Sequence, residues 1–262
     1  MFLKPRAAAA DTTSVNLAFA AVVFAPGLAV GSFLNVVAAR LPLGRSVVKP
    51  RSSCMSCGTE VRSLDNIPIV SYLLLRGKCR TCKATIGWRY PAVELATALL
   101  VAASFLVFGP TLHAAAAAVF CTALVAISAT DIEHRIVPNK VVLPAAVVVL
   151  ALQLAWHPTI QWPAAGFGAA LFLFLAALAY PRGMGMGDVK LALLLGFGVG
   201  RSVPVALFGG MLAALLPSLV LFARHGMAAR KMKIPFAPFL ALGGVFALFA
   251  GNAILDWYLR LL

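Results

Sequence analysis

The sequence predicts an all-α polytopic membrane protein, with about eight transmembrane helices and one small polar domain between the first helix and the second. Hydrophobic residues make up 62% of the chain, charged residues only 11%, and the mean hydropathy is +0.96. Soluble domains carry about 25% charged residues, so this composition excludes an ordinary globular core. The apolar residues fall in separate runs, most of them near the roughly 20 residues that a helix needs to cross a bilayer.

The first apolar run covers residues 15–39 and follows a tail that carries Lys4 and Arg6. It is too long for the apolar part of a signal peptide, so we interpret it as the first transmembrane helix. Further spans are expected near residues 92–109, 112–131, 138–156, 161–180, 188–200, 202–223 and 236–258. The run at 188–200 is short and glycine-rich, which favours a tilted helix or one entered from a broken segment. The predicted domains are residues 1–39 (tail and first helix), 40–90 (polar block) and 91–262 (helical bundle).

Basic residues are concentrated on one side of this arrangement. The formal net charge is +14, and ten of the 22 Lys and Arg lie between Arg40 and Arg89. With the N-terminus outside, the segments 40–90, 131–140, 181–190 and 224–235 lie inside and hold 18 of the 22. The positive-inside rule strongly favours this orientation. The charge therefore indicates topology and contact with anionic headgroups, and predicts no nucleic-acid partner; whether the basic block also has a substrate role stays open.

The polar block contains two CxxC pairs, Cys54 with Cys57 and Cys79 with Cys82. Two such pairs separated by about 20 residues are typical of a four-thiolate zinc site. We expect a structural zinc, because four thiolates leave no open position for catalysis and because a block of about 50 residues needs such support. A dithiol redox pair is the alternative, although the predicted cytoplasmic side argues against disulfides. Cys121 has no partner in sequence and is expected to be a small buried side chain.

Two aspartates mark the same membrane boundary. Asp131 ends the third span and Asp188 opens the sixth, so both are expected at the cytoplasmic face and at similar depth. Two carboxylates at close range share one proton, so that one can act as a general base and the other as a general acid. Gly185 and Gly187 would leave room beside Asp188 for a substrate backbone. The alternative is a purely structural role, in which Asp188 caps a helix and Asp131 pairs with Arg135.

Other polar residues near this boundary have less specific roles. Glu133 is two positions from Asp131 and would face elsewhere on a helix, and His134 could be a ligand or base. Lys190 could act on Asp188 or face lipid headgroups. Glu94 opens the second span, where it suits the helix dipole or faces a polar cavity.

Five segments together resemble the type IV prepilin peptidases, also called leader peptidase/N-methyltransferases. They are "GSFLNVVAARLP" (31–42), the block at 52–98 with its "DNIP" and "RYPAVE" elements, "DIEHRIVPN" (131–139), "GMGD" (185–188) and "KIPFAPFLALGG" (233–244). The "GMGD" segment matches the GxGD motif of intramembrane-type aspartyl proteases. The resemblance covers nearly the whole chain, and the five segments occur in the family's order.

The resemblance implies a helical bundle in the bacterial cytoplasmic (inner) membrane, with the active site toward the cytoplasm. It implies removal of the basic leader from prepilins or pseudopilins, followed by N-methylation of the new N-terminus from S-adenosylmethionine. The residues that fall on family positions are the catalytic Asp131 and Asp188, the motif glycines Gly185 and Gly187, and the metal-binding Cys54, Cys57, Cys79 and Cys82. No glycine fingerprint indicates where S-adenosylmethionine binds.

The sequence departs from the family pattern at Met55, where many members carry proline, and at Ala237, where glycine is common. We expect Met55 to affect the rigidity of a knuckle and Ala237 to crowd the approach to the active site slightly. Two other functions stay open at this point. One is a membrane scaffold whose zinc block docks a partner such as a pilus assembly ATPase, and the other is a membrane thiol oxidoreductase.

Overall fold

The computed structural model describes residues 6–180, 184–226 and 234–261, and these residues form helices, turns and two isolated β-bridges without a named strand. They divide into two compact units, Met1–Ala114 (unit 1) and Ala115–Leu262 (unit 2). Unit 1 contains α1 (Arg6–Arg40), α2 (Val70–Leu74) and α3 (Arg89–Phe108). Helix α4 (Leu112–His134) begins at the boundary, and unit 2 continues with α5 (Asn139–Trp156), α6 (Gln161–Ala179), α7 (Met186–Val199), α8 (Val203–His225), α9 (Ala237–Phe246) and α10 (Asn252–Leu259).

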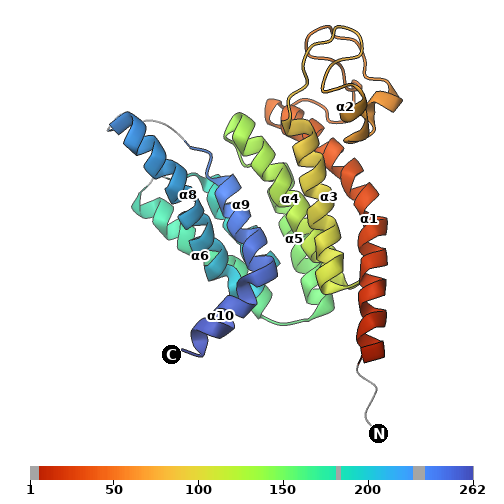
Figure 1. Ribbon diagram of the computed structural model, residues 1–262. Helices are drawn as coiled ribbons and strands as arrows, with labels where there is room; N and C mark the ends of the chain where they lie inside the picture. The colour runs from red at the N-terminus through yellow and green to blue at the C-terminus, as the bar shows by residue number, and fades with distance from the viewer. Residues whose placement is uncertain (1–5, 181–183, 227–233, 262) are drawn as a thin grey trace. The chain divides into compact units, whose positions relative to one another are not determined.

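In unit 1, α1 and α3 run side by side, and the cysteine-bearing block lies between them in sequence (Figure 1). Their backbones approach closely at two glycines of α1. A Cβ at Gly31 would lie 2.6 Å from the Cα of Glu94, and one at Gly27 would lie 2.9 Å from the Cα of Ala98. Small residues at a helix interface are the usual means of packing apolar helices in a membrane. This contact fixes which face of α3 looks toward α1.

The core of unit 2 forms around Phe120 of α4, which is fully buried. A Cβ at Gly198 of α7 would clash with the Phe120 ring, and one at Gly244 of α9 would lie 3.3 Å from it. Helices α8 and α9 also pack side by side (Figure 1). At one end of α7, the side chain of Gln153 on α5 donates a buried hydrogen bond of 3.2 Å to the Gly198 carbonyl. Helix α7 is therefore enclosed by its neighbours, and nine of its 14 residues are buried.

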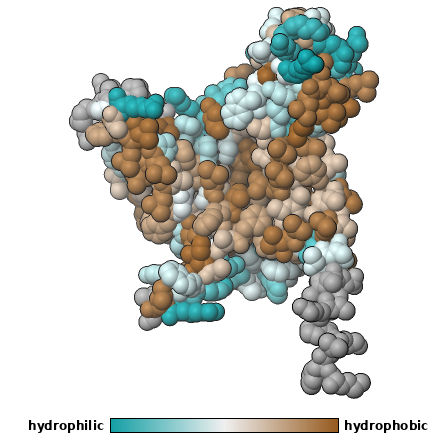
Figure 2. Space-filling model, in the orientation of Figure 1, coloured by the Kyte–Doolittle hydropathy of each residue, from teal (hydrophilic) through white to brown (hydrophobic). Residues whose placement is uncertain are grey.

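Seven helical segments within the described residues are long and apolar enough to cross a membrane. The prediction of an all-α polytopic membrane protein is confirmed. Seven segments are counted because α7 has only 14 residues and joins α8 through a 3₁₀ turn at Gly200–Ser202, so that both helices fall in the single apolar segment Met186–Arg224. This segment of 39 residues is long enough for two crossings, so it agrees with the expected count of about eight. Figure 2 shows hydrophobic residues along the flanks of the helices and hydrophilic residues over the cysteine-bearing block.

Helix α3 packs with α1 in unit 1. The two units group residues by contact, and the predicted domains 1–39, 40–90 and 91–262 stay a prediction. The cysteine-bearing block is thus an insertion between two paired helices. It opens with Arg40, whose guanidinium donates to the carbonyls of Ser46 and Pro50 and so holds the chain where it leaves α1.

Candidate active site and metal centre

The four cysteines of unit 1 lie on two knuckles with the same backbone pattern. In the first, Cys54 N–H donates to the Thr59 carbonyl, and in the second, Cys79 N–H donates to the Ala84 carbonyl. The fourth residue after each leading cysteine has a left-handed backbone, with φ 71° at Gly58 and φ 60° at Lys83. A turn of this kind brings both thiols of each CxxC pair to one side.

The knuckles bring all four thiols together, as the cysteine spacing predicts. The Sγ atoms of Cys54, Cys57, Cys79 and Cys82 lie within 4.8 Å of one another, and those of Cys54 and Cys82 are 3.7 Å apart. Tetrahedral zinc with Zn–S bonds of about 2.3 Å requires S–S distances of about 3.8 Å. The four sulfurs therefore fit a zinc ion with a small adjustment. Among the described residues, no other set of three or more Cys, His, Asp or Glu side chains is placed to hold a metal.

Two local interactions support the metal centre. Cys57 Sγ lies 3.4 Å from the Thr59 hydroxyl, and the side chain and backbone of Thr59 lower the pKa of the Cys57 thiol to about 6. A thiolate is the form that binds metal. Beside the second knuckle, Arg80 Nε donates to Asp65 Oδ2 at 2.8 Å, and its hydrogen bonds and charge hold the pKa of Asp65 below its ordinary value. This pair ties the turn at Ser63–Asn66 to the second knuckle.

In unit 2, Asp131 lies at the last turn of α4 and is 6% exposed. Its Oδ2 accepts a 3.1 Å hydrogen bond from the backbone N–H of Ala237, the first residue of α9. The N–H of Arg135 donates to the Asp131 carbonyl, and a left-handed Arg135, with φ 55°, ends the helix. Among the described residues no ion pair within 4 Å joins the Asp131 and Arg135 side chains.

Asp188 lies in the first turn of α7 and is half-buried. The chain after α4 leads directly to it, because Val137 packs against Gly187: a Cβ at Gly187 would lie 2.9 Å from the Val137 Cβ. This contact places the start of α7 beside the end of α4. The helix end that carries Asp131 and the helix start that carries Asp188 are therefore neighbours within unit 2. That the two carboxylates act as a pair stays a prediction.

The two motif glycines have different surroundings. The space beside Gly187 is filled by Val137, so this glycine serves a close contact rather than open room. Gly185 is exposed, and a Cβ there would meet nothing nearer than Asp188 Oδ2 at 3.8 Å. Of the two glycines, only Gly185 leaves open space beside Asp188 among the described residues. Gly183, the third glycine of the stretch, lies outside the described residues.

The neighbouring polar residues do not complete a second centre. His134 Nε2 lies 3.8 Å from Glu133 Oε2 and belongs to no metal-binding group of the described residues. Lys190 Nζ donates to the Asn139 side chain at 2.8 Å, which links the first turn of α7 to the start of α5. Lys190 thus braces the position of α7 near Asp188 instead of facing only the headgroups.

Sequence reasoning missed the contact that Ala237 makes. We expected the methyl group of Ala237 to crowd the active site, but Ala237 is fully buried and its backbone N–H faces Asp131. Every residue except proline has a backbone N–H, so the sequence does not show which of them donates to a distant side chain. The only signal in the sequence was the start of a helix after Pro235, because the first N–H groups of a helix have no partner within it.

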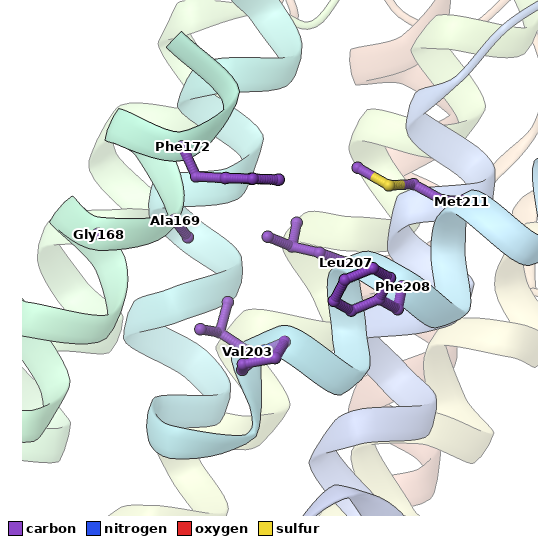
Figure 3. Close-up of a pocket in the computed structure, with 8 residues that line it drawn as sticks. Gly168, Ala169, Phe172, Val203, Leu207, Phe208 and Met211 are labelled. Atoms are coloured by element: carbon purple, nitrogen blue, oxygen red, sulfur yellow. The ribbon is translucent and has the colours of Figure 1, made fainter. Parts of the chain in front are cut away.

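Unit 2 also contains an apolar cavity of about 280 Å³ between α6 and α8 (Figure 3). Phe172 of α6 and Leu207 and Phe208 of α8 are among its lining residues, which include no ionisable side chain. A cavity with this lining can hold an alkyl group but cannot perform acid–base chemistry. The paired aspartates are therefore the candidate site for catalysis in unit 2.

The fold and the site define a class, a multi-pass helical membrane protein with an aspartate at each of two adjoining helix ends and a four-cysteine cluster that could hold a zinc ion. The chain matches two protein-family models, the bacterial peptidase A24 N-terminal domain over residues 26–108 and the type IV leader peptidase family over residues 118–222. It belongs to the type IV leader peptidase family, which confirms the resemblance found in the sequence.

Relatives match over nearly the full chain. A protein of Bacillus subtilis is 36% identical over 245 residues, which cover 92% of this chain and 98% of the relative. Proteins of Pseudomonas aeruginosa and Burkholderia pseudomallei are each 37% identical over 278 residues, covering 93% of this chain and 94% and 88% of the relatives. All three are named prepilin leader peptidase/N-methyltransferase. No solved structure gave a significant match.

Proposed function

We propose that this chain is a membrane aspartyl endopeptidase that removes the leader of type IV prepilins and then methylates the new N-terminus. Membership of the type IV leader peptidase family supports the reaction class. The observation that supports the mechanism is the contact of Val137 with Gly187, which brings the end of α4, with Asp131, beside the start of α7, with Asp188.

The peptidase step uses the two aspartates as one acid–base pair. Asp131, which the Ala237 N–H orients, takes a proton from water, and this water attacks the scissile carbonyl carbon. Asp188 gives its proton to the leaving nitrogen as the C–N bond breaks. One C–O bond forms for each C–N bond that breaks. At the end of the reaction Asp131 carries a proton and Asp188 has lost one. Solvent reaches Asp188 from the side of Gly185.

The metal centre is structural in this proposal. Cys54, Cys57, Cys79 and Cys82 hold zinc with all four positions taken, so the ion has no place for substrate. It fixes the two knuckles with respect to each other and keeps the block between α1 and α3 folded. A redox role for the thiols would require disulfides, whereas the four sulfurs are arranged as one cluster.

The second activity is methyl transfer. S-adenosylmethionine, when bound, supplies an activated methyl group. This chain's residues have to bind the donor, bind the new amino terminus, and let that amine lose a proton. We assign this activity to unit 1, because the paired aspartates lie in unit 2 and the family's N-terminal domain covers residues 26–108.

We also propose that the protein lies in the bacterial inner membrane with its N-terminus outside and the aspartates toward the cytoplasm. The distribution of Lys and Arg supports this orientation, since 18 of the 22 then lie inside. Reporter fusions after residues 43, 110, 158 and 226 would test it. Activity of a periplasmic reporter at 43 and 226 would contradict it.

The function is tested by cleavage of a co-expressed prepilin. Asp131→Asn and Asp188→Asn should each lower cleavage at least about 100-fold, as expected for the loss of an acid–base group. Glu133→Gln, which changes a neighbouring acid of the same helix, is the matched control and should cleave at the wild-type rate. Full processing by either aspartate variant would rule out the pair mechanism.

A further inference from the structure

Glu94 is a buried acidic residue in unit 1 that the peptidase chemistry does not use. It lies in the second turn of α3 and is 8% exposed. Its Oε2 accepts a 2.8 Å hydrogen bond from the backbone N–H of Ile69. Over residues 6–180, 184–226 and 234–261, no Lys, Arg or His forms an ion pair with it. Burying a carboxylate costs free energy, and here no cation offsets that cost, so a binding partner for the charge is a reasonable explanation.

Asn35 of α1 brings a second acceptor to the same place. It is 4% exposed, its Nδ2 donates to the Tyr90 carbonyl at 3.1 Å, and its Oδ1 has no hydrogen-bond partner in the described part of the chain. Tyr90 and Glu94 are four residues apart on α3 and share a face, as Gly31 and Asn35 do on α1. Because Gly31 packs directly on Glu94, the Asn35 amide lies over the turn that carries Glu94.

These groups come from two of the five segments that carry the resemblance, 31–42 and 52–98. Asn35 belongs to "GSFLN", Ile69 follows "DNIP", and Glu94 ends "RYPAVE". Unit 1 therefore brings three stretches of the chain to one buried polar position.

A purely structural role, in which Glu94 holds the loop at Ile69, explains only part of this arrangement. Ile69 has a left-handed backbone, with φ 59°, which is unfavourable for a β-branched residue, and the Glu94 carboxylate holds its N–H. A neutral glutamine would accept the same hydrogen bond. The hydrogen bond between Glu94 and Ile69 needs neither the negative charge of Glu94 nor the unpaired oxygen of Asn35. Burying each of these costs free energy.

We propose that Glu94 and Asn35 Oδ1 bind the ammonium group of a participant in methyl transfer, which rests on the function proposed above. An ammonium group has three donors and no acceptor, so it suits a site with two oxygen acceptors of which one is charged. The Nδ2 donor of Asn35 is already committed to Tyr90. Two molecules carry such a group: S-adenosylmethionine, through its amino-acid part, and the cleaved prepilin, through its new N-terminus.

Binding to the purified full-length protein tests the proposal through two variants. Glu94→Gln removes the charge and keeps an acceptor for Ile69, while Asn35→Leu removes the unpaired oxygen. Thr97→Val is the matched control, because Thr97 is buried one turn further along α3 and bonds only to the carbonyl of Val93 in its own helix. The probes are S-adenosylmethionine and a peptide that begins with a free phenylalanine amine, with the N-acetylated peptide beside it.

We expect both variants to bind one probe roughly 10- to 100-fold more weakly, as for the loss of a hydrogen bond to a charged group, with Thr97→Val unchanged. Weaker S-adenosylmethionine binding assigns the ammonium to the donor. Weaker binding of the free peptide, with the acetylated peptide binding poorly to wild type, assigns it to the new N-terminus.

Wild-type affinity of Glu94→Gln for both probes would overturn the proposal, and so would failure of the wild-type protein to bind either probe. Prepilin cleavage is measured on the same preparations. Retained cleavage with unchanged binding defeats this inference alone, whereas a wild-type protein that does not cleave defeats the proposed function. Because Glu94→Gln preserves the hydrogen bond to Ile69, the test does not depend on Asn35→Leu folding.

Discussion

The backbone N–H of Ala237 donates a 3.1 Å hydrogen bond to Oδ2 of Asp131, across 106 positions of the sequence. Ala237 is the first residue of α9, so its N–H has no partner inside its own helix. The positive end of the helix dipole also points at the carboxylate. The start of α9 therefore fixes the orientation of the Asp131 side chain.

Replacing Ala237 with proline removes this donor at the first position of α9, where the proline ring itself fits but the αR backbone of Phe236 has to adjust. We expect the kcat for prepilin cleavage to fall roughly 10- to 100-fold with little change in KM, since a hydrogen bond to a charged group is lost. Ala237→Gly keeps the N–H and should retain most activity. Thermal unfolding of both variants separates this effect from misfolding, and equal activity of the two would contradict the role of the hydrogen bond.

Gly187 and Gly185 should respond differently to alanine. At Gly187 the new Cβ would lie 2.9 Å from Val137 Cβ, so α7 must shift relative to the end of α4. A displacement of about 1 Å near a catalytic group costs on the order of 100-fold in rate, so we expect a loss of this order for Gly187→Ala. At Gly185 the Cβ meets only Asp188 Oδ2 at 3.8 Å, and Gly185→Ala should unfold at the wild-type temperature.

The double variant Gly187→Ala with Val137→Gly provides the internal control. Val137→Gly removes the Cβ that the new Cβ would meet at 2.9 Å, so part of the lost cleavage should return. A double variant no more active than Gly187→Ala alone would show that the glycine acts by some other means than contact with Val137. The KM of Gly185→Ala reports separately whether substrate passes beside Asp188.

Local and compositional features could be predicted from the sequence. The helical class followed from apolar runs of spanning length, and the cysteine cluster followed from CxxC spacing, because two knuckles can present four thiols whatever the length of the loop between them. The placement of Asp131 and Asp188 at one boundary followed from the distribution of Lys and Arg, which reports the side of each loop without any knowledge of packing.

Contacts between distant backbones could not be predicted in this way. The Ala237 N–H has no side-chain signature, and the sequence offered no means to tell that Gly187 is filled by Val137 while Gly185 stays open. The pairing of α3 with α1 depends on glycines spaced four apart at Gly27 and Gly31, a pattern that occurs elsewhere in the chain without specifying a partner. Glu94 looked like an ordinary first-turn acid until Asn35 and Ile69 were placed beside it.

Zinc removal should affect the cysteine-bearing block of unit 1. We expect about one zinc per chain in protein purified in detergent, and none in Cys79→Ser, since three thiolates bind the ion far more weakly. Without zinc the segment between residues 44 and 88 should become sensitive to limited proteolysis. Cys121→Ala, which changes the buried cysteine of α4, should keep its zinc. Protein without zinc but with titratable disulfides would instead support a thiol oxidoreductase.

The pair of Asp65 and Arg80 gives the block a defined dependence on pH. Arg80 holds the pKa of Asp65 below its ordinary value of about 4, first through hydrogen bonds and then through its charge. A carboxyl group whose pKa is lowered by folding stabilises the folded state above its unfolded pKa, and this stabilisation is lost as the pH falls through the lowered value. The unfolding temperature of wild type should therefore exceed that of Asp65→Asn by a constant amount above about pH 5, and the difference should shrink below about pH 4. Glu60→Gln, at an exposed acid of the same block, should show no such trend, and a difference between wild type and Asp65→Asn that persists to pH 2 would show that the ion pair is not its source.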